Sequence, residues 1–137
     1  ILLFPFCSEH LEQKRWPYYD QLIKLIKQNH PNLKIAIAPG PGEIEKAKEL
    51  DAISILSEDK AISISELAGL IKRSKFVVAN DTGPAHMAAH LNVKGLSLFG
   101  SHTTAYKVSI ERENFKAIQV SDLKNLSARK VFERLAF

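Results

Sequence analysis

The sequence predicts an α/β fold: a doubly wound, six-stranded parallel sheet of the Rossmann-like type, with helices on both faces. Short apolar runs alternate with amphipathic helical segments along the chain, and this alternation is typical of parallel sheets. The apolar runs are nearly continuous, as in strands that are buried on both faces. With 137 residues the chain is long enough for one domain with a core and too short for two, so 1–137 is expected to be a single domain.

Six apolar runs are the predicted strands, because each has the length of a buried strand and is bounded by polar or turn-forming residues. In chain order they are Ile1–Phe4, Leu33–Ala38, Ala52–Leu56, Phe76–Ala79, Gly95–Phe99 and Phe115–Val120. Right-handed crossovers limit the possible topologies, and the expected order across the sheet is 3-2-1-4-5-6.

Five helices are predicted between and after these strands. They are Tyr18–Asn29, Glu43–Leu50, Ser63–Arg73, Gly83–Leu91 and Ser127–Ala136. Pro31 ends the first helix, since the residue before a proline disfavours the helical conformation. Ser63 and Glu66 have the spacing of a capping box at the start of the third helix. Pro84 suits the first turn of the fourth helix.

The predicted topology also indicates where a ligand binds. In a doubly wound sheet, ligands bind beyond the carboxyl ends of the strands at the point where the strand order reverses, here between strands one and four. The connections at this point are Pro5–Pro17, predicted as a long polar loop, and Asn80–Pro84. The connection after strand five, from Gly100 to about Arg112, is predicted as a loop with at most one helical turn. The first two connections carry the unusual polar residues of the chain.

The stretch from Phe76 to His90 is predicted as a strand, a sharp turn and a helix. Free N–H groups of Thr82, Gly83 and Ala85 at the helix start are predicted to form a site for an anion such as phosphate. Gly83 permits close backbone approach. Asp81 and His86 add a carboxylate and an imidazole within one helical turn. The alternative is that Asp81 only caps the helix and that His86 is a packed or surface side chain.

Three other positions join this predicted site. Lys14, after the first strand, is expected to hold a diphosphate as a mobile point charge, whereas Arg15 is expected to be solvated and Trp16 to pack the loop onto the sheet. Glu43, after a glycine-rich turn, is a candidate for binding ribose hydroxyls; a dipole-favoured acid at a helix start is an equal alternative. Gly100 follows strand five and is a weaker candidate for a phosphate or sugar contact.

Composition narrows the classes of function. The net charge of +4 comes from scattered lysines and arginines, which favours solvated helix faces over a nucleic-acid surface. No zinc-like Cys/His spacing and no Walker A lysine motif occurs. No apolar run is long enough to span a membrane. Cys7, the single cysteine, has no obvious base partner and is interpreted as structural or incidental.

Several segments together resemble the carboxyl-terminal domain of glycosyltransferase family 9, the ADP-heptose:lipopolysaccharide heptosyltransferases. These segments are Lys14-Arg15-Trp16-Pro17, Pro39-Gly40-Pro41-Gly42-Glu43, Asp81-Thr82-Gly83-Pro84-Ala85-His86-Met87-Ala88-Ala89 and Leu98-Phe99-Gly100. The resemblance extends from strand one to the last helix. The chain departs from the family after Gly100: where the family usually has Pro-Thr, this sequence has Ser101-His102-Thr103-Thr104.

The resemblance implies one half of a glycosyltransferase B-type fold that binds a nucleotide-diphosphate sugar, ADP-heptose in this family. By the same resemblance, Lys14 matches the lysine on the donor phosphates and Glu43 the ribose-binding acid. Asp81, Thr82, Gly83 and His86 match the donor-site block. An amino-terminal domain outside this chain would bind the lipopolysaccharide acceptor and supply the catalytic base, so no catalytic residue is expected here and the chain alone is expected to be inactive.

The implied reaction is inverting and metal-independent, with no cofactor, in the bacterial cytoplasm or at the inner membrane surface. Two alternatives stay open at this point. One is a nucleotide-sugar epimerase of the same fold, and the other is a non-catalytic nucleotide-binding module.

Overall fold

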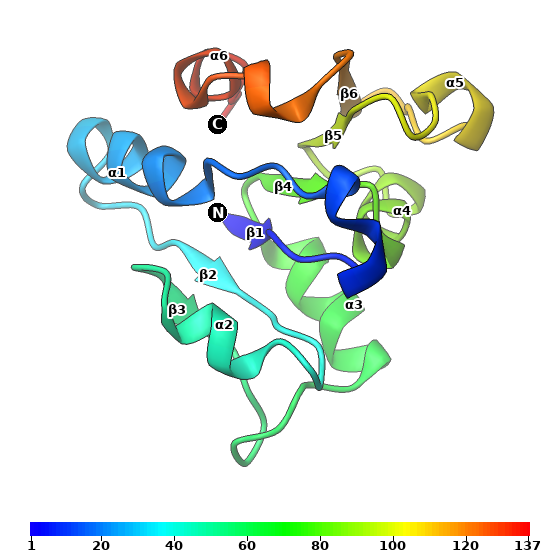
Figure 1. The fold of residues 1–137 in the computed structure, drawn as a ribbon. Helices are drawn as coiled ribbons and strands as arrows, with labels where there is room; N and C mark the ends of the chain where they lie inside the picture. Colours follow the sequence, from blue (N-terminus) through cyan, green and yellow to red (C-terminus); the bar gives the residue numbers. More distant parts are fainter.

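Six parallel strands form one sheet in the order β3-β2-β1-β4-β5-β6 in the computed structural model of this protein (Figure 1). Residues 1–137 are described, apart from the side chain of Glu9. The predicted topology, with its reversal between the first and fourth strands, is therefore confirmed. The strands are β1 (Leu2–Phe4), β2 (Ala36–Ile37), β3 (Ile53–Ser54), β4 (Val77–Asn80), β5 (Gly95–Phe99) and β6 (Phe115–Gln119).

Helices cover both faces of the sheet, because side chains along each strand alternate between two apolar layers. Leu3 and Val78 face one layer, which α1, α2 and α6 complete, and Leu2 and Val77 face the other, which α3 and α4 complete (Figure 1). The α-helices are α1 (Tyr19–Asn29), α2 (Ile44–Lys48), α3 (Ile64–Arg73), α4 (Gly83–His90), α5 (Ala105–Val108) and α6 (Ala128–Glu133).

The two strands on one side of the sheet are shorter than predicted. The prediction of Leu33–Ala38 is too long because the Leu33 N–H is bonded in a turn to the carbonyl of His30, which leaves β2 with two residues. The prediction of Ala52–Leu56 is too long for a similar reason. β3 lies at the edge of the sheet, and a tight turn closed by hydrogen bonds between Ser57 and Lys60 begins two residues after Ile55, whose N–H donates to the Ile37 carbonyl.

Two short 3-10 helices lie where none was predicted. The first, η1 (Glu9–Lys14), replaces the middle of the predicted loop Pro5–Pro17, and the second, η2 (Leu123–Asn125), precedes α6. Helix α6 ends at Glu133, short of the predicted Ala136. Sequence patterns did not indicate either 3-10 helix, because both are set by packing against the sheet rather than by apolar periodicity.

The other predicted local features are confirmed. Ser63 accepts from the Glu66 N–H, and the Glu66 carboxylate accepts from the Ser63 N–H, so the capping box of α3 is formed. Helix α5 is the single helical turn expected after β5. Within residues 1–137, no described helix is both long and apolar enough to cross a membrane.

Candidate functional site

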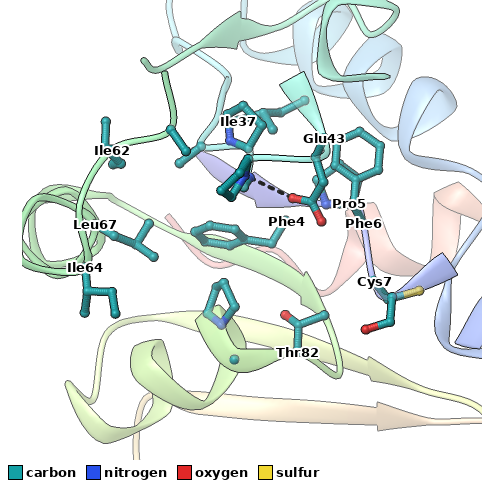
Figure 2. Close-up of a pocket in the computed structure, with 18 of the residues that line it drawn as sticks. Phe4, Pro5, Phe6, Cys7, Ile37, Glu43, Ile62, Ile64, Leu67 and Thr82 are labelled. Atoms are coloured by element: carbon teal, nitrogen blue, oxygen red, sulfur yellow. Dashed lines mark hydrogen bonds between the residues drawn. The ribbon is translucent and has the colours of Figure 1, made fainter. Parts of the chain in front are cut away.

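A cavity of about 710 Å³ opens at the carboxyl edge of the sheet, at the point of strand reversal (Figure 2). Residues from the loops after β1, β2 and β4 and from the start of α3 line it. This volume is in the range of small-molecule sites. The topological prediction and the shape of the molecule therefore agree on the position of the candidate site.

One wall of the cavity is apolar. This wall consists of Phe4 and Ile37 from the strand ends and of Ile62, Ile64 and Leu67 around the start of α3 (Figure 2). Ile64 is 76% exposed, so this end of the wall faces solvent. A wall of this kind suits the flat face of an aromatic ligand such as a nucleotide base.

The opposite end of the cavity is formed by the start of helix α4. Thr82 is the N-cap residue, but its side chain does not cap the helix; its hydroxyl donates instead to the Asn80 carbonyl at 3.4 Å. The first N–H groups of an α-helix have no partner within the helix. A Cβ atom added at Gly83 would have no atom within 4 Å, so the backbone here faces open space. The helix start is therefore accessible to an anion, as predicted.

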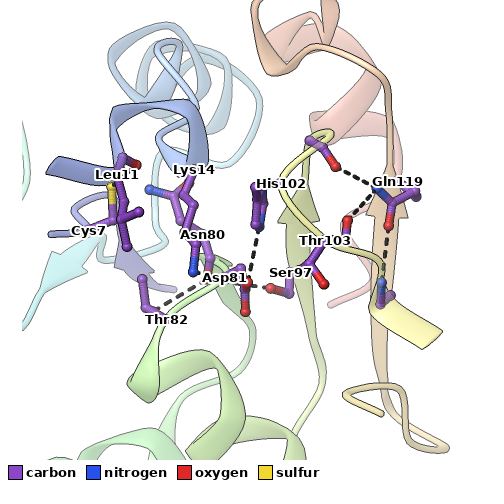
Figure 3. A network of polar contacts seen from close by, with 12 residues as sticks. Cys7, Leu11, Lys14, Asn80, Asp81, Thr82, Ser97, His102, Thr103 and Gln119 are labelled. Carbon is purple, nitrogen blue, oxygen red and sulfur yellow. Dashed lines mark hydrogen bonds and ion pairs between the residues drawn. The ribbon is translucent and has the colours of Figure 1, made fainter. Parts of the chain in front are cut away.

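Asp81 lies at the centre of a charged cluster beside this helix start (Figure 3). Its side chain is only 6% exposed. Lys14 Nζ lies 3.6 Å from Asp81 Oδ2, His86 Nε2 lies 3.3 Å from Oδ1, and His102 Nε2 lies 3.1 Å from Oδ2. Asp81 therefore does not serve as the cap of α4, whose N-cap residue is Thr82; it joins three partners from separate parts of the chain instead.

The position of Lys14 depends on the buried Asn80 at the end of β4. The Asn80 side-chain oxygen accepts from the Trp16 N–H and the Tyr19 hydroxyl, and its amide donates to the Pro5 carbonyl at 2.9 Å. These contacts fix the segment that carries η1 against β4. The sequence analysis placed Asn80 only in the turn and did not predict that its side chain holds the first loop. A polar residue at the end of a buried strand was the feature that could have indicated this role.

Glu43 lies in the cavity and also holds the turn before it. Its Oε1 accepts from the Gly40 N–H at 2.8 Å, while the residue stays half-buried in the cavity lining. Both readings of Glu43, as a ribose acceptor and as an acid that stabilises a helix start, are therefore compatible with its position.

The predicted site residues do not all meet in one cavity. Lys14, Glu43, Asp81, Thr82 and Gly83 line the first cavity, and His86 reaches it through Asp81. Gly100 lines a second cavity of about 970 Å³, and its carbonyl accepts from the Gln119 side chain at 2.7 Å. The structure therefore does not bring Gly100 into the same cavity as the other predicted site residues, and its contact with a phosphate or sugar stays a prediction.

The interpretation of Trp16 as a packing residue is confirmed. Trp16 is buried, and its indole N–H donates to the Leu126 carbonyl at 2.7 Å. The Arg15 guanidinium lies 5.3 Å from the centre of the Phe6 ring. Cys7 donates to the Leu11 carbonyl, and burial raises the pKa of its thiol. A thiol with a raised pKa is a poor nucleophile, in line with a structural role.

The fold and the site together define an α/β domain with a cavity at the point of strand reversal, lined in part by Lys14 and the start of α4. The model of the family described as glycosyltransferase family 9 (heptosyltransferase) matches residues 1–134. The chain therefore belongs to this family of glycosyltransferases.

The chain spans only part of the length of the relatives that it matches. Lipopolysaccharide heptosyltransferase 1 of Campylobacter coli is 31% identical over 77% of this chain and 33% of its own length. The structure of Escherichia coli heptosyltransferase WaaC with ADP matches 96% of this chain and 42% of its own, at 23% identity and a TM-score of 0.83. Escherichia coli ADP-heptose lipopolysaccharide heptosyltransferase II matches 96% and 44%, at 20% identity and a TM-score of 0.76. The chain thus spans about a third of its curated relative and less than half of these structures, which share its glycosyltransferase B-type fold.

Proposed function

We propose that this chain is the donor-binding domain of an inverting heptosyltransferase, which transfers heptose from ADP-heptose to the lipopolysaccharide core. The observation that carries the proposal is the cavity at the strand reversal, with an apolar wall at one end and Lys14 and the α4 start at the other. The family match and the WaaC structures, one with ADP and one with ADP-2-deoxy-2-fluoro heptose, support the choice of donor.

The division of the cavity matches the parts of such a donor. The base would lie against Phe4, Ile37 and Leu67, and the diphosphate would lie at the start of α4 beside Lys14. Glu43, which also lines the cavity, is the acceptor available to the ribose hydroxyls. Base, ribose and diphosphate would then each contact a chemically distinct part of the lining.

Departure of the nucleoside diphosphate leaves negative charge on its phosphates. Lys14 and the free N–H groups at the start of α4 would stabilise this charge, because they are held in place before the reaction begins. In this proposal no metal ion or cofactor takes part. Asp81 is occupied by its three partners, so the base that activates the acceptor is assigned to a domain outside this chain.

The remaining part of the longer protein would bind the acceptor, as the coverage of less than half of the solved heptosyltransferases suggests. The proposed acceptor is the lipopolysaccharide core, and the proposed location is the cytoplasm or the inner membrane surface. The 137-residue chain is then expected to bind the donor without transferring its sugar.

Calorimetric titration of the chain with ADP, UDP, GDP and adenosine tests the proposal. We expect a preference for ADP, and Lys14→Ala should weaken ADP about ten- to a hundredfold while leaving adenosine unchanged, since a charge-assisted contact contributes about 1.5–3 kcal/mol. Lys24→Ala, which removes the same charge from an exposed position on α1, is the matched control. A preference for UDP would favour an epimerase, and absence of nucleotide binding would contradict the proposal.

A further inference from the structure

His102 occupies a position that the proposed donor chemistry does not yet explain. It lies in the loop after β5, where the sequence has Ser101-His102-Thr103-Thr104, and its side chain is only 5% exposed. Its ring stacks on Phe99, with ring centres 5.8 Å apart and planes inclined by 12°. Its Nε2 lies 3.1 Å from Asp81 Oδ2, the same oxygen that faces Lys14 (Figure 3).

The contacts of the ring indicate which nitrogen of His102 carries the proton. An ionised carboxylate only accepts, so Nε2 must donate to Asp81. Nδ1 is buried and has no hydrogen-bond partner among the described residues. A proton on Nδ1 would be a buried donor without an acceptor. His102 is therefore assigned as a neutral imidazole with its proton on Nε2.

A neutral donor at this place changes how strongly Asp81 holds Lys14. The carboxylate is buried, and its charge would otherwise be balanced mainly by the lysine. His102 donates to Oδ2 and His86 contacts Oδ1, so both oxygens have a partner besides Lys14. The distance of 3.6 Å between Lys14 Nζ and Oδ2 is longer than that of a close charge-assisted hydrogen bond. Lys14 thus keeps capacity for a second anion.

We propose that His102 is a positioning residue for the donor diphosphate: by donating to Asp81 Oδ2, it keeps Lys14 available for the phosphates. This inference rests on the proposed function. It assigns a role in the donor site to the loop after β5, the part of the chain that departs from the family pattern. His102 acts through Asp81 and Lys14 and does not itself contact the ligand.

Two variants separate the hydrogen bond from packing. His102→Phe keeps a flat ring on Phe99 but removes the donor, whereas His102→Gln places an amide N–H close to the position of Nε2. We expect His102→Phe to weaken ADP and inorganic pyrophosphate about tenfold and to leave adenosine unchanged. His102→Gln should bind all three ligands within about twofold of the parent. Circular dichroism and thermal melting check that each variant is folded.

A double-mutant cycle tests whether His102 acts through Lys14. In the Lys14→Ala background, His102→Phe should cause no further loss of pyrophosphate affinity, because the residue that it positions is gone. Additive losses would overturn the inference. If the parent binds ADP and folded His102→Phe binds it equally well, this inference fails while the proposed function stands. If the parent binds neither ADP nor pyrophosphate, the proposed function and this inference both fail.

Proton–nitrogen correlation NMR provides a measurement that does not require any variant. We expect a proton on Nε2 of His102, which donates to Asp81 Oδ2, and none on Nδ1, which has no partner among the described residues. A proton on Nδ1 would overturn the assignment of His102 as a neutral donor, and with it the inference.

Discussion

Substitution of Gly83 by valine tests whether the start of α4 is the phosphate site. Gly83 is the first residue of the helix, and no glycine in the described chain has a positive φ, so a larger residue meets no backbone strain. A Cβ atom there would have no atom within 4 Å and would point into open space at the cavity lining. Gly83→Val should therefore leave the free energy of unfolding within about 1 kcal/mol of the parent.

The expected loss of affinity follows from the donors that the new side chain would cover. Pro84 has no N–H, so the first turn of α4 offers the N–H groups of Gly83 and Ala85 to an anion. Each hydrogen bond to a charged phosphate contributes about 1.5–3 kcal/mol. Losing both costs about 3–6 kcal/mol, which corresponds to a loss of ADP affinity of about a hundredfold to ten-thousandfold.

Calorimetry with ADP, beside urea unfolding of the same samples, measures both quantities. Gly69→Val is the matched control, because a Cβ atom at Gly69 also meets nothing within 4 Å, but Gly69 lies on α3 away from the cavity lining. The control should bind ADP like the parent. If Gly83→Val is folded and also binds ADP like the parent, the phosphates lie elsewhere and the proposed orientation of the donor is wrong.

Three further predictions concern single residues. Burial raises the pKa of Cys7, so its alkylation by iodoacetamide should be slow at neutral pH and should speed up only above the pH range in which thiols usually ionise. Cys7 lines the cavity, so bound ADP should slow the reaction further. Alkylation at the rate of a free thiol would contradict this prediction. Hydrogen bonds from the backbone and side chain of Ser63 lower the pKa of Glu66. The ionised carboxylate therefore stabilises the fold above its unfolded pKa, and this contribution is lost as pH falls through the lowered folded pKa. Glu66→Gln should thus lower the melting temperature at neutral pH and match the parent in strong acid; an equal difference at both pH values would refute the linkage. Gly95→Ala should destabilise by about 1–3 kcal/mol in urea unfolding, because its Cβ would lie 2.6 Å from the Val77 carbonyl; an unchanged midpoint would contradict it.

The strand order was predictable from the sequence, but the lengths of β2 and β3 were not. β5 has the predicted bounds, Gly95–Phe99, because all five of its residues are buried and it pairs with a strand on each side. The run Ala52–Leu56 looks similar in sequence, yet only Ile53–Ser54 pairs. An apolar run indicates burial, whereas pairing at a sheet edge depends on the neighbouring turn, here the one closed between Ser57 and Lys60.

The candidate site was predictable where a local pattern carried it. Thr82 and Gly83 follow a buried strand and begin a helix, so their N–H groups could be placed from the sequence. His102 could not be placed in the same way, because it lies in a loop of irregular conformation. Its contact with Asp81 joins residues separated by 21 positions and arises only when β4 and β5 pair side by side.

Lys14 has a position at the site that could not be predicted from the residues next to it in the sequence. It lies at the end of a short 3-10 helix whose packing no apolar periodicity indicates, and it reaches the site because Asn80 holds the backbone at Pro5 and Trp16. These two hydrogen bonds span 75 and 64 residues of sequence. Both partners flank η1, so its two ends are tied to the strand that leads into Asp81. A buried amide with no place in the proposed chemistry thus sets the separation between the lysine and the aspartate, and through it the charge that the cavity presents to a diphosphate.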